Sequence, residues 1–159
     1  MRRVIRAALA AALLLSLSCL SSGGHIPAPP GGAVAVGPAT ALAFHARAEA
    51  FYQRLIWRRF NALETFSDPF LRQHFRSEDR FFDYYAALAE ALDEADFEKS
   101  RPTRVMVEEF LFETPTSARV QVRFKGEDDR PMRIDATYLV RLDRWEWAEE
   151  NWWITPGKL

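Results

Sequence analysis

The stretch from Met132 to Ile154 constrains the fold of this chain more than any other segment. Apolar and polar side chains alternate from residue 132 to residue 143, which is typical of a β-strand with one face toward a core. Four of the five tryptophans follow within residues 145–153. The stretch therefore predicts a long strand, a tight reversal and a second strand rich in tryptophan.

Asp143 and Arg144 occupy the expected reversal. Aspartate suits a turn, but arginine is a poor replacement for the glycine that two-residue hairpins prefer, so a longer loop is the alternative. With a two-residue turn, the predicted inner face of the first strand holds Met132, Ile134, Ala136, Tyr138, Val140 and Leu142. The predicted pairs are Leu142 with Trp145, Val140 with Trp147, Tyr138 with Glu149, Ala136 with Asn151, and Ile134 with Trp153.

Two polar residues, Glu149 and Asn151, fall on this predicted inner face. Burying a polar group without a partner is costly. Either these side chains line a cavity, or a bulge between Ala148 and Glu150 turns them toward solvent. The sequence leaves both alternatives open.

Three helices are predicted before the first strand. Apolar residues at spacings of three and four place one long amphipathic helix over Ala41–Leu63. Ser67-Asp68-Pro69 and Ser77-Glu78-Asp79 are helix starts, with a capping side chain and then proline or acids in the first turn. They predict a short helix over Pro69–Phe75 and a longer one from Ser77 that closes at Arg101-Pro102.

Two further strands are predicted between the helices and the long hairpin. Thr103–Phe112 is the first, although adjacent Glu108 and Glu109 blur its alternation and one of them must point inward. Ser117–Lys125 alternates clearly, with inner residues Ala118, Val120, Val122 and Phe124. The predicted fold is therefore α+β, with three N-terminal helices packed on a four-stranded antiparallel sheet.

The N-terminus predicts a cleaved targeting segment over residues 1–18. Three arginines precede an apolar run from Ala7 to Leu17 that is short for a membrane span. The run ends at Ser18-Cys19, which resembles the lipobox of bacterial lipoproteins, except that Ser16 stands where leucine is usual. That resemblance implies cleavage before Cys19 and lipid attachment to its thiol. An ordinary secretory signal is the alternative.

Residues 19–40 are predicted to form the lipidated cysteine and a flexible Gly/Pro/Ala-rich tether, and residues 41–159 the folded domain. About twenty tether residues give a mean reach near ~25 Å. Leu20, rather than aspartate, follows the cysteine, which resembles the default for outer-membrane sorting. The expected location is thus the bacterial cell envelope, lipid-anchored, at the outer membrane.

Charge and composition exclude several classes of function. The chain has 21 basic and 22 acidic side chains, and loss of residues 1–18 leaves 18 against 22. An acidic domain of this kind is a poor nucleic-acid binder. Cys19 is the only cysteine, and no His, Cys and carboxylate spacing suits a metal. We therefore expect no metal, no cofactor and no nucleic-acid partner.

The order of helices and strands resembles that of the nuclear transport factor 2-like superfamily, a cystatin-like α+β fold. The resemblance covers about Ala41–Pro156. It depends on element order and on the closing pattern of residues 138–145, YLVRLDRW, with Trp152-Trp153-Ile154. It implies a strongly bent, cone-like sheet with an open mouth. The superfamily contains enzymes as well as noncatalytic binding modules, so the fold alone does not decide the function.

We expect a membrane-tethered accessory domain that binds a hydrophobic small ligand or an envelope protein in the cone, with a second copy of the chain on the outer sheet face as a further partner. The alternative is a small enzyme of the isomerase, dehydratase or hydrolase type, in which an inward carboxylate acts as base and Tyr138 as hydrogen-bond donor. The candidate pocket residues for both are Glu108, Tyr138, Trp147, Glu149 and Asn151.

Overall fold

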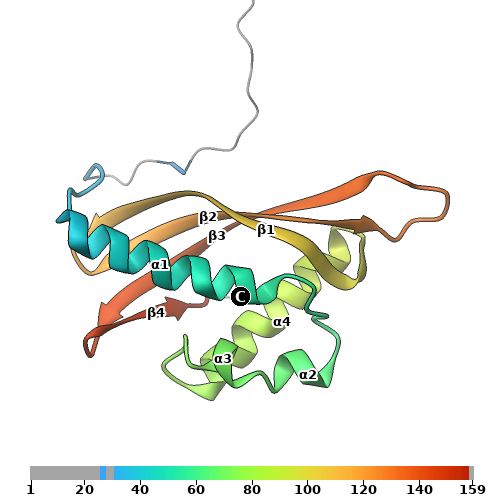
Figure 1. Cartoon of the computed structure of the whole chain (residues 1–159), viewed down its shortest axis with the longest axis horizontal. Coiled ribbons are helices and arrows are strands. Elements are labelled where there is room, and N and C mark those ends of the chain that lie inside the picture. Colours follow the sequence, from blue (N-terminus) through green and yellow to red (C-terminus); the bar gives the residue numbers. More distant parts are fainter. Residues whose placement is uncertain (1–25, 28–30, 158–159) are drawn as a thin grey trace, which may run out of the picture.

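The computed structural model describes residues 26–27 and 31–157, and the chain is an α+β protein with four helices followed by four strands (Figure 1). The predicted targeting segment 1–18 and Cys19 lie outside the described residues, and the predicted tether is described only in part. The helices are α1 (Pro38–Leu55), α2 (Leu63–Phe66), α3 (Pro69–Arg72) and α4 (Glu78–Glu94). The strands are β1 (Phe97–Thr114), β2 (Ser117–Asp128), β3 (Ala136–Ala148) and β4 (Asn151–Thr155).

Helix α1 is shorter than its sequence pattern predicts. It starts at Pro38, where the missing N–H of proline costs nothing, and ends at Leu55 rather than continuing to Leu63. Trp57 has a φ of 65° and donates its backbone N–H to the Pro102 carbonyl at 2.8 Å. This contact with β1 replaces the next helical turn, and the short α2 begins only at Leu63. Four helices, rather than the predicted three, are therefore present in the described residues.

Both predicted helix starts are confirmed. The Asp68 carboxylate accepts a hydrogen bond from the Phe70 backbone N–H at 2.9 Å, at the start of α3. The Ser77 hydroxyl accepts one from the Arg80 backbone N–H at 3.3 Å, at the start of α4. These caps depend on residues two or three positions apart, which is why local sequence predicts them. The apolar stripe of α4 is buried through Phe81, Tyr84, Leu88 and Leu92.

The sheet is antiparallel and open, with strand order β1-β2-β3-β4. The predicted meander of four strands is confirmed, but β1 begins at Phe97, so Arg101 and Pro102 lie inside a strand instead of closing a helix. The predicted inner residues of β2 are confirmed as well, since Ala118, Val120, Val122 and Phe124 are all fully buried.

The predicted turn at Asp143-Arg144 is wrong. Strand β3 runs through these residues without a break, and Arg144 pairs with Thr155 of β4. The reversal lies at Glu149-Glu150, whose φ angles are 55° and 60°, between the paired residues Ala148 and Asn151. Positive φ at both positions is the geometry of a type I′ hairpin, in which Asn-Gly is the usual sequence. Because two glutamates occupy these positions instead, the sequence does not predict this turn.

The predicted inner face of β3 is also wrong. Leu139, Arg141, Asp143 and Trp145 point inward, whereas Tyr138, Val140 and Leu142 are 51%, 45% and 45% exposed on the opposite, outer face. Met132 and Ile134 precede the strand in the β2–β3 loop and are almost fully exposed. The outer face of β3 thus carries an exposed apolar stripe, and its inner face carries an acid and a base.

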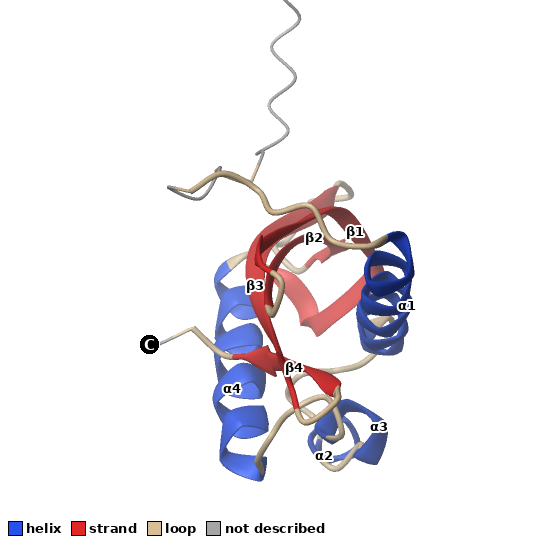
Figure 2. Cartoon of the chain, turned by 90° about the vertical axis from the view of Figure 1, so that its left-hand side faces the viewer, coloured by secondary structure: helices blue, strands red, loops and turns tan. Residues whose placement is uncertain are grey.

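The core lies between the inner face of the curved sheet and the helices. In Figure 2, α4 lies to the left and α1 to the right of the curved sheet, with the buried faces of both in the same core, and α2 and α3 lie together at one end. The core contains aromatic side chains from every layer, including Phe44, Phe51, Tyr84, Phe124 and Trp145. The β2–β3 hairpin extends beyond the helices (Figure 1). Within the described ranges, no helix is both long and apolar enough to cross a membrane.

Candidate functional site

The structure does not bring the five predicted pocket residues together. Glu108 and Tyr138 lie on the outer sheet face. Glu108 accepts a hydrogen bond from the Gln121 side chain at 3.0 Å and pairs with Arg123. Tyr138 is exposed, and the Lys125 ammonium lies 5.7 Å from its ring centroid. Neither side chain faces the core.

Glu149, Asn151 and Trp147 lie around the β3–β4 turn. The Glu149 carboxylate is 75% exposed and stands 4.0 Å from Arg76. The Asn151 side-chain oxygen accepts from the Trp152 backbone N–H at 3.0 Å. The predicted contact between an inward Glu149 and Tyr138 is therefore wrong, because one residue is in a solvated turn and the other is on the outer face. Of the five, Trp147 lines a concave surface that is described below.

An unpredicted polar cluster occupies the core instead. Asp143 of β3 has a side chain only 3% exposed. Its Oδ2 atom accepts hydrogen bonds from the hydroxyls of Tyr52 in α1 and Tyr84 in α4, each at 2.8 Å. One carboxylate thus connects the two long helices to the sheet. Buried carboxylates require such donors, since an unpaired charge in the interior is very costly.

Arg141 and Trp145, the inward neighbours of Asp143 on β3, complete this cluster. Arg141 Nε lies 3.5 Å from Asp143 Oδ1, and its guanidinium lies 5.0 Å from the Tyr84 ring centroid. The Trp145 indole N–H donates to the Tyr52 hydroxyl at 3.2 Å. We call Tyr52, Tyr84, Arg141, Asp143 and Trp145 the Asp143 cluster.

Electrostatics keep the tyrosines of the Asp143 cluster protonated. Burial and the Asp143 charge raise the pKa of both Tyr52 and Tyr84 well above the ordinary value for tyrosine. Burial works to lower the pKa of Arg141, but Tyr84 and Asp143 outweigh it and raise that pKa. The two hydroxyls therefore remain donors and the guanidinium remains charged, which is an arrangement that holds helices to a sheet. The sequence offered one clue, since tyrosines on apolar helix stripes need a buried partner for their hydroxyls.

The concave surface beside Trp147 is an apolar groove with a volume of about 490 Å³. The N-terminal turns of α1, the β1–β2 turn and the β3–β4 hairpin form its walls. We call it the Trp147 groove; it is lined by Ala39, Thr40, Ala43, Pro115, Thr116, Trp147 and Trp152. All of these side chains are uncharged.

The two tryptophans of the Trp147 groove differ in burial. Trp152 is 2% exposed and packs edge-on against Phe44 at a centroid distance of 4.8 Å. Trp147 pairs with it across the hairpin at 5.5 Å but is 41% exposed. The backbone N–H of Trp147 donates to the Thr116 carbonyl at 2.8 Å. A fixed wall and a half-exposed indole on a rigid backbone are features of preformed sites for apolar ligands.

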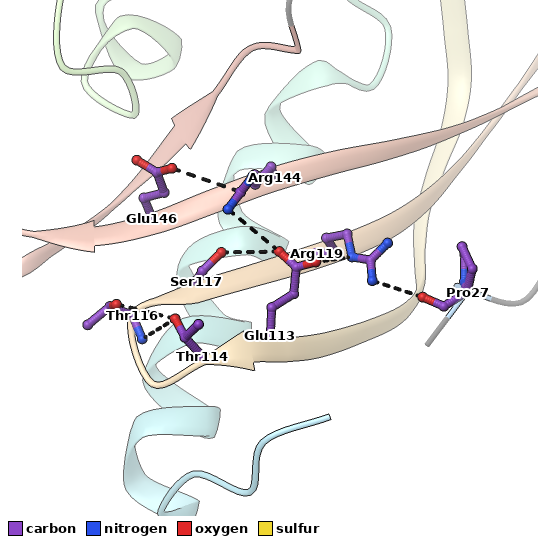
Figure 3. Close-up of polar contacts among 8 residues, drawn as sticks. All are labelled: Pro27, Glu113, Thr114, Thr116, Ser117, Arg119, Arg144 and Glu146. Atoms are coloured by element: carbon purple, nitrogen blue, oxygen red, sulfur yellow. Dashed lines mark hydrogen bonds and ion pairs between the residues drawn. The ribbon is translucent and has the colours of Figure 1, made fainter. Parts of the chain in front are cut away.

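The outer sheet face carries a ladder of charges beside the apolar stripe (Figure 3). Glu113 of β1 lies 2.8 Å from Arg119 of β2 and 3.8 Å from Arg144 of β3, and it accepts a hydrogen bond from the Ser117 hydroxyl at 3.3 Å. Arg144 in turn lies 3.9 Å from Glu146. One carboxylate therefore links three neighbouring strands on this face.

Ile26 and Pro27 of the predicted tether lie against the same face, whereas Pro38–Thr40 already belong to α1. Arg119 donates to the Pro27 carbonyl at 2.8 Å (Figure 3), and the Ile26 backbone N–H donates to Glu109 at 3.1 Å. Ile26 is 1% exposed. Further along, the Val34 N–H donates to the Phe112 carbonyl at 2.8 Å. These parts of the segment therefore contact the sheet, whereas the sequence predicts a free tether.

Comparison with known proteins gives no relative: no family model matches the chain, and no curated protein or solved structure matches it. In the described part of the chain, no three His, Cys, Asp or Glu side chains come together as a metal site would require.

Proposed function

We propose that this chain is a lipid-anchored protein of the bacterial cell envelope whose domain binds a hydrophobic small molecule in the Trp147 groove. The observation that carries the proposal is the half-exposed Trp147 indole over a rigid, uncharged wall. The large apolar area of a tryptophan ring favours burial, and tryptophan is enriched where one side of the ring contacts a partner. The proposed activity is binding, without chemistry on the ligand.

The size of the groove supports a small molecule as its occupant. Sites for small molecules usually measure about 300–1,000 Å³, and the Trp147 groove holds about 490 Å³. The small side chains of Ala39 and Ala43 leave space below the Trp147 ring. The lining offers the Thr40 and Thr116 hydroxyls but no charge, which favours a neutral ligand.

The fold that we propose is a member of the nuclear transport factor 2-like superfamily, with helices packed on a bent, cone-like sheet. Helices that precede a curved antiparallel sheet support this assignment. In the proposed arrangement the Asp143 cluster fills the interior, and binding moves to the groove at the end of the sheet. The predicted contact for a second copy of the chain is the outer sheet face, and we propose that it now includes the exposed side chains of Tyr138, Val140 and Leu142, which the sequence pattern placed on the inner face.

A catalytic function would have to use the carboxylate of Asp143 instead of that of Glu149. Asp143 faces inward and Glu149 does not, and the partners of Asp143 are Tyr52 and Tyr84 instead of Tyr138. The Asp143 carboxylate already has Arg141 beside one oxygen and two hydroxyls on the other. It is not among the residues that line the Trp147 groove. We therefore favour binding over catalysis.

Lipid anchoring is tested by Cys19→Ala. We expect the wild-type protein to partition into the detergent phase of a Triton X-114 extract and to incorporate an alkyne-labelled fatty acid. Cys19→Ala should lose the label and move to the aqueous phase, because the acyl chains supply the membrane affinity. The matched control Ser21→Ala should behave as wild type. Unchanged labelling and partitioning of Cys19→Ala would show that Cys19 carries no lipid.

Ligand binding is tested with the neutral fluorescent probe N-phenyl-1-naphthylamine. We expect saturable binding to the detergent-purified protein, and Trp147→Ala should weaken it about tenfold, which corresponds to ~1.4 kcal/mol. Ala43→Leu should have a similar effect, because the larger side chain fills the groove from the opposite wall. The measurement is a fluorescence titration of each variant after subtraction of the signal from detergent alone.

Trp57→Ala is the matched control for this titration, since Trp57 is also exposed but lies outside the groove. It should leave the affinity for the probe unchanged. Equal affinity in wild type, Trp147→Ala and Ala43→Leu would rule out the Trp147 groove as the binding site.

A further inference from the structure

A second concave site lies at the other end of α1, between the α1–α2 connection, α2 and β1. It has a volume of about 860 Å³. We call it the Trp57 pocket; the lining residues that matter here are Trp57, Arg58, Arg59, Leu63, Glu64 and Arg101. None of its lining residues belongs to the Trp147 groove.

Trp57 is held in an unfavourable backbone conformation with its ring outside the core. Its φ of 65° is rare for a bulky residue, yet its side chain is 60% exposed. The facing part of β1 is also strained, since Lys99 and Ser100 have φ angles of 57° and 46°. The two segments are joined by hydrogen bonds from Trp57 to Pro102 and from Phe60 to Ser100. Core packing of the indole does not account for this strain, and strain of this kind is concentrated at functional sites.

Arg101 presents an incompletely satisfied cation in this pocket. Its guanidinium lies 5.4 Å from the Trp57 ring centroid, and its side chain is 21% exposed. The Nε atom is buried and has no hydrogen-bond partner among the described residues. The nearest carboxylate, Glu127, is 3.7 Å from Nη2 and is itself 61% exposed. A buried donor without an acceptor is unfavourable.

The charges around the pocket favour an anion. Arg58 lies 3.3 Å from the buried Asp68 carboxylate, which it shares with Arg54. Arg59 has no ion-pair partner within residues 26–27 and 31–157. Glu64 is the one acid in the lining. Besides Arg58, the lining therefore contains two guanidiniums, those of Arg59 and Arg101, and one carboxylate.

We propose that the Trp57 pocket binds a phosphate monoester whose planar or apolar part lies against the Trp57 indole and Leu63. A guanidinium can donate two parallel hydrogen bonds to the oxygens of a phosphate, and the Arg101 side chain is 21% exposed where it lines the pocket. Arg59 supplies the second positive charge. The strained loop then has a function, because it places an indole face beside the cationic groups that hold the phosphate.

The phosphate group can belong to a soluble metabolite or to a lipid headgroup, and calorimetric titration of the detergent-purified protein distinguishes them. The probes are 1-naphthyl phosphate, dihexanoyl phosphatidic acid and inorganic phosphate, with 1-naphthol as the uncharged comparison. We expect at least one of the two organic phosphates to bind with a Kd below about 1 mM, more tightly than inorganic phosphate, and excess 1-naphthol not to displace it from the Trp57 pocket. Preference for naphthyl phosphate indicates a soluble ligand, and preference for the phosphatidic acid indicates a lipid.

Substitutions in the pocket give the decisive comparison. Arg101→Ala and Trp57→Ala should each weaken the organic phosphate about tenfold. Glu64→Gln should strengthen it severalfold by removing the opposing charge. Arg104→Ala removes an exposed arginine from the same strand and should change nothing. Arg101→Lys, which keeps the charge without the planar fork, should recover only part of the affinity.

Binding of N-phenyl-1-naphthylamine serves as the fold check for each variant, because its proposed site is the separate Trp147 groove; thermal unfolding replaces it if that groove binds nothing. The proposal is overturned if neither organic phosphate binds, or if a folded Arg101→Ala protein binds them as tightly as Arg104→Ala. It is also overturned if 1-naphthol competes as well as 1-naphthyl phosphate, since the phosphate would then contribute nothing.

Discussion

Replacing Asp143 with alanine is expected to lower the free energy of unfolding by about 3–5 kcal/mol, the usual cost of removing one partner from a buried ion pair. The substitution leaves the hydroxyls of Tyr52 and Tyr84 without their acceptor and leaves Arg141 without a counter-ion. The two hydroxyls are buried, and the Arg141 side chain is only 18% exposed. Urea-induced unfolding, followed by tryptophan fluorescence and by circular dichroism, measures the change.

Graded variants separate the charge of Asp143 from its hydrogen bonds. Asp143→Asn retains one acceptor oxygen and should be less damaging than Asp143→Ala. Tyr52→Phe and Tyr84→Phe each remove one donor and should cost about 0.5–1.5 kcal/mol. Asp135→Ala, at an exposed position before β3, is the matched control and should stay within about 0.5 kcal/mol of wild type.

A double substitution tests whether the cluster acts as a unit. Arg141→Met should destabilise the wild-type protein more than it destabilises Asp143→Ala, in which the cation has already lost its partner. The expected coupling is in the range of about 0.5–3 kcal/mol for residues in one network. If the two effects simply add, or if Asp143→Ala unfolds at the wild-type urea concentration, the Asp143 cluster does not hold the helices to the sheet.

The features that could be predicted from the sequence are those set by near neighbours. The caps at Asp68 and Ser77 involve residues two or three positions away. The alternation of β2 is regular because its inner side chains are all apolar. In both cases the local chemistry and the fold agree, so pattern reasoning is sufficient.

Strand β3 shows why the rest could not be predicted. Its polar inner residues Arg141 and Asp143 are satisfied by tyrosines from α1 and α4, separated from Asp143 by 91 and 59 positions. A pattern argument places such residues outside, because it cannot see distant partners. Because of that one error, Tyr138 was predicted on the inner face instead of the outer one, and the turn was predicted six residues too early. The candidate pocket residues therefore do not lie together in the structure. Of these, Trp147 lines the groove that we propose as the ligand site, and Tyr138 lies on the proposed outer contact face.

The early end of α1 also results from a contact with a residue that is distant in the sequence. The apolar stripe continues past Leu55, but Trp57 leaves the helix to bond with Pro102 of β1. Local propensity is a weak prior that tertiary contacts override. The overridden position is also where the Trp57 pocket forms, in keeping with the general expectation that conflicts between local and global preference occur at functional sites.

Stability is expected to fall as the pH is lowered through the range from 6.5 to about 4, because of His74. Burial, with the nearby Arg47 charge, lowers the pKa of His74 from 6.5 to about 4. Its ring lies among Phe51, Phe70 and Trp145, and its Nδ1–H donates to the Phe70 carbonyl at 2.8 Å. In this range the unfolded chain binds a proton that the folded chain excludes, so protonation favours unfolding.

The size of this effect distinguishes His74 from the many carboxylates that also titrate in acid. His74 alone should cost about 2 kcal/mol between pH 7 and pH 5. His74→Gln can keep a donor for the Phe70 carbonyl but cannot be protonated, so its loss of stability over the same interval should be smaller by that amount. Urea unfolding of both proteins at pH 7 and pH 5 gives the comparison. If both proteins lose the same free energy of unfolding between pH 7 and pH 5, the pKa of His74 is the same in the folded and the unfolded chain. The aromatic side chains around His74 would then not disfavour its charged form.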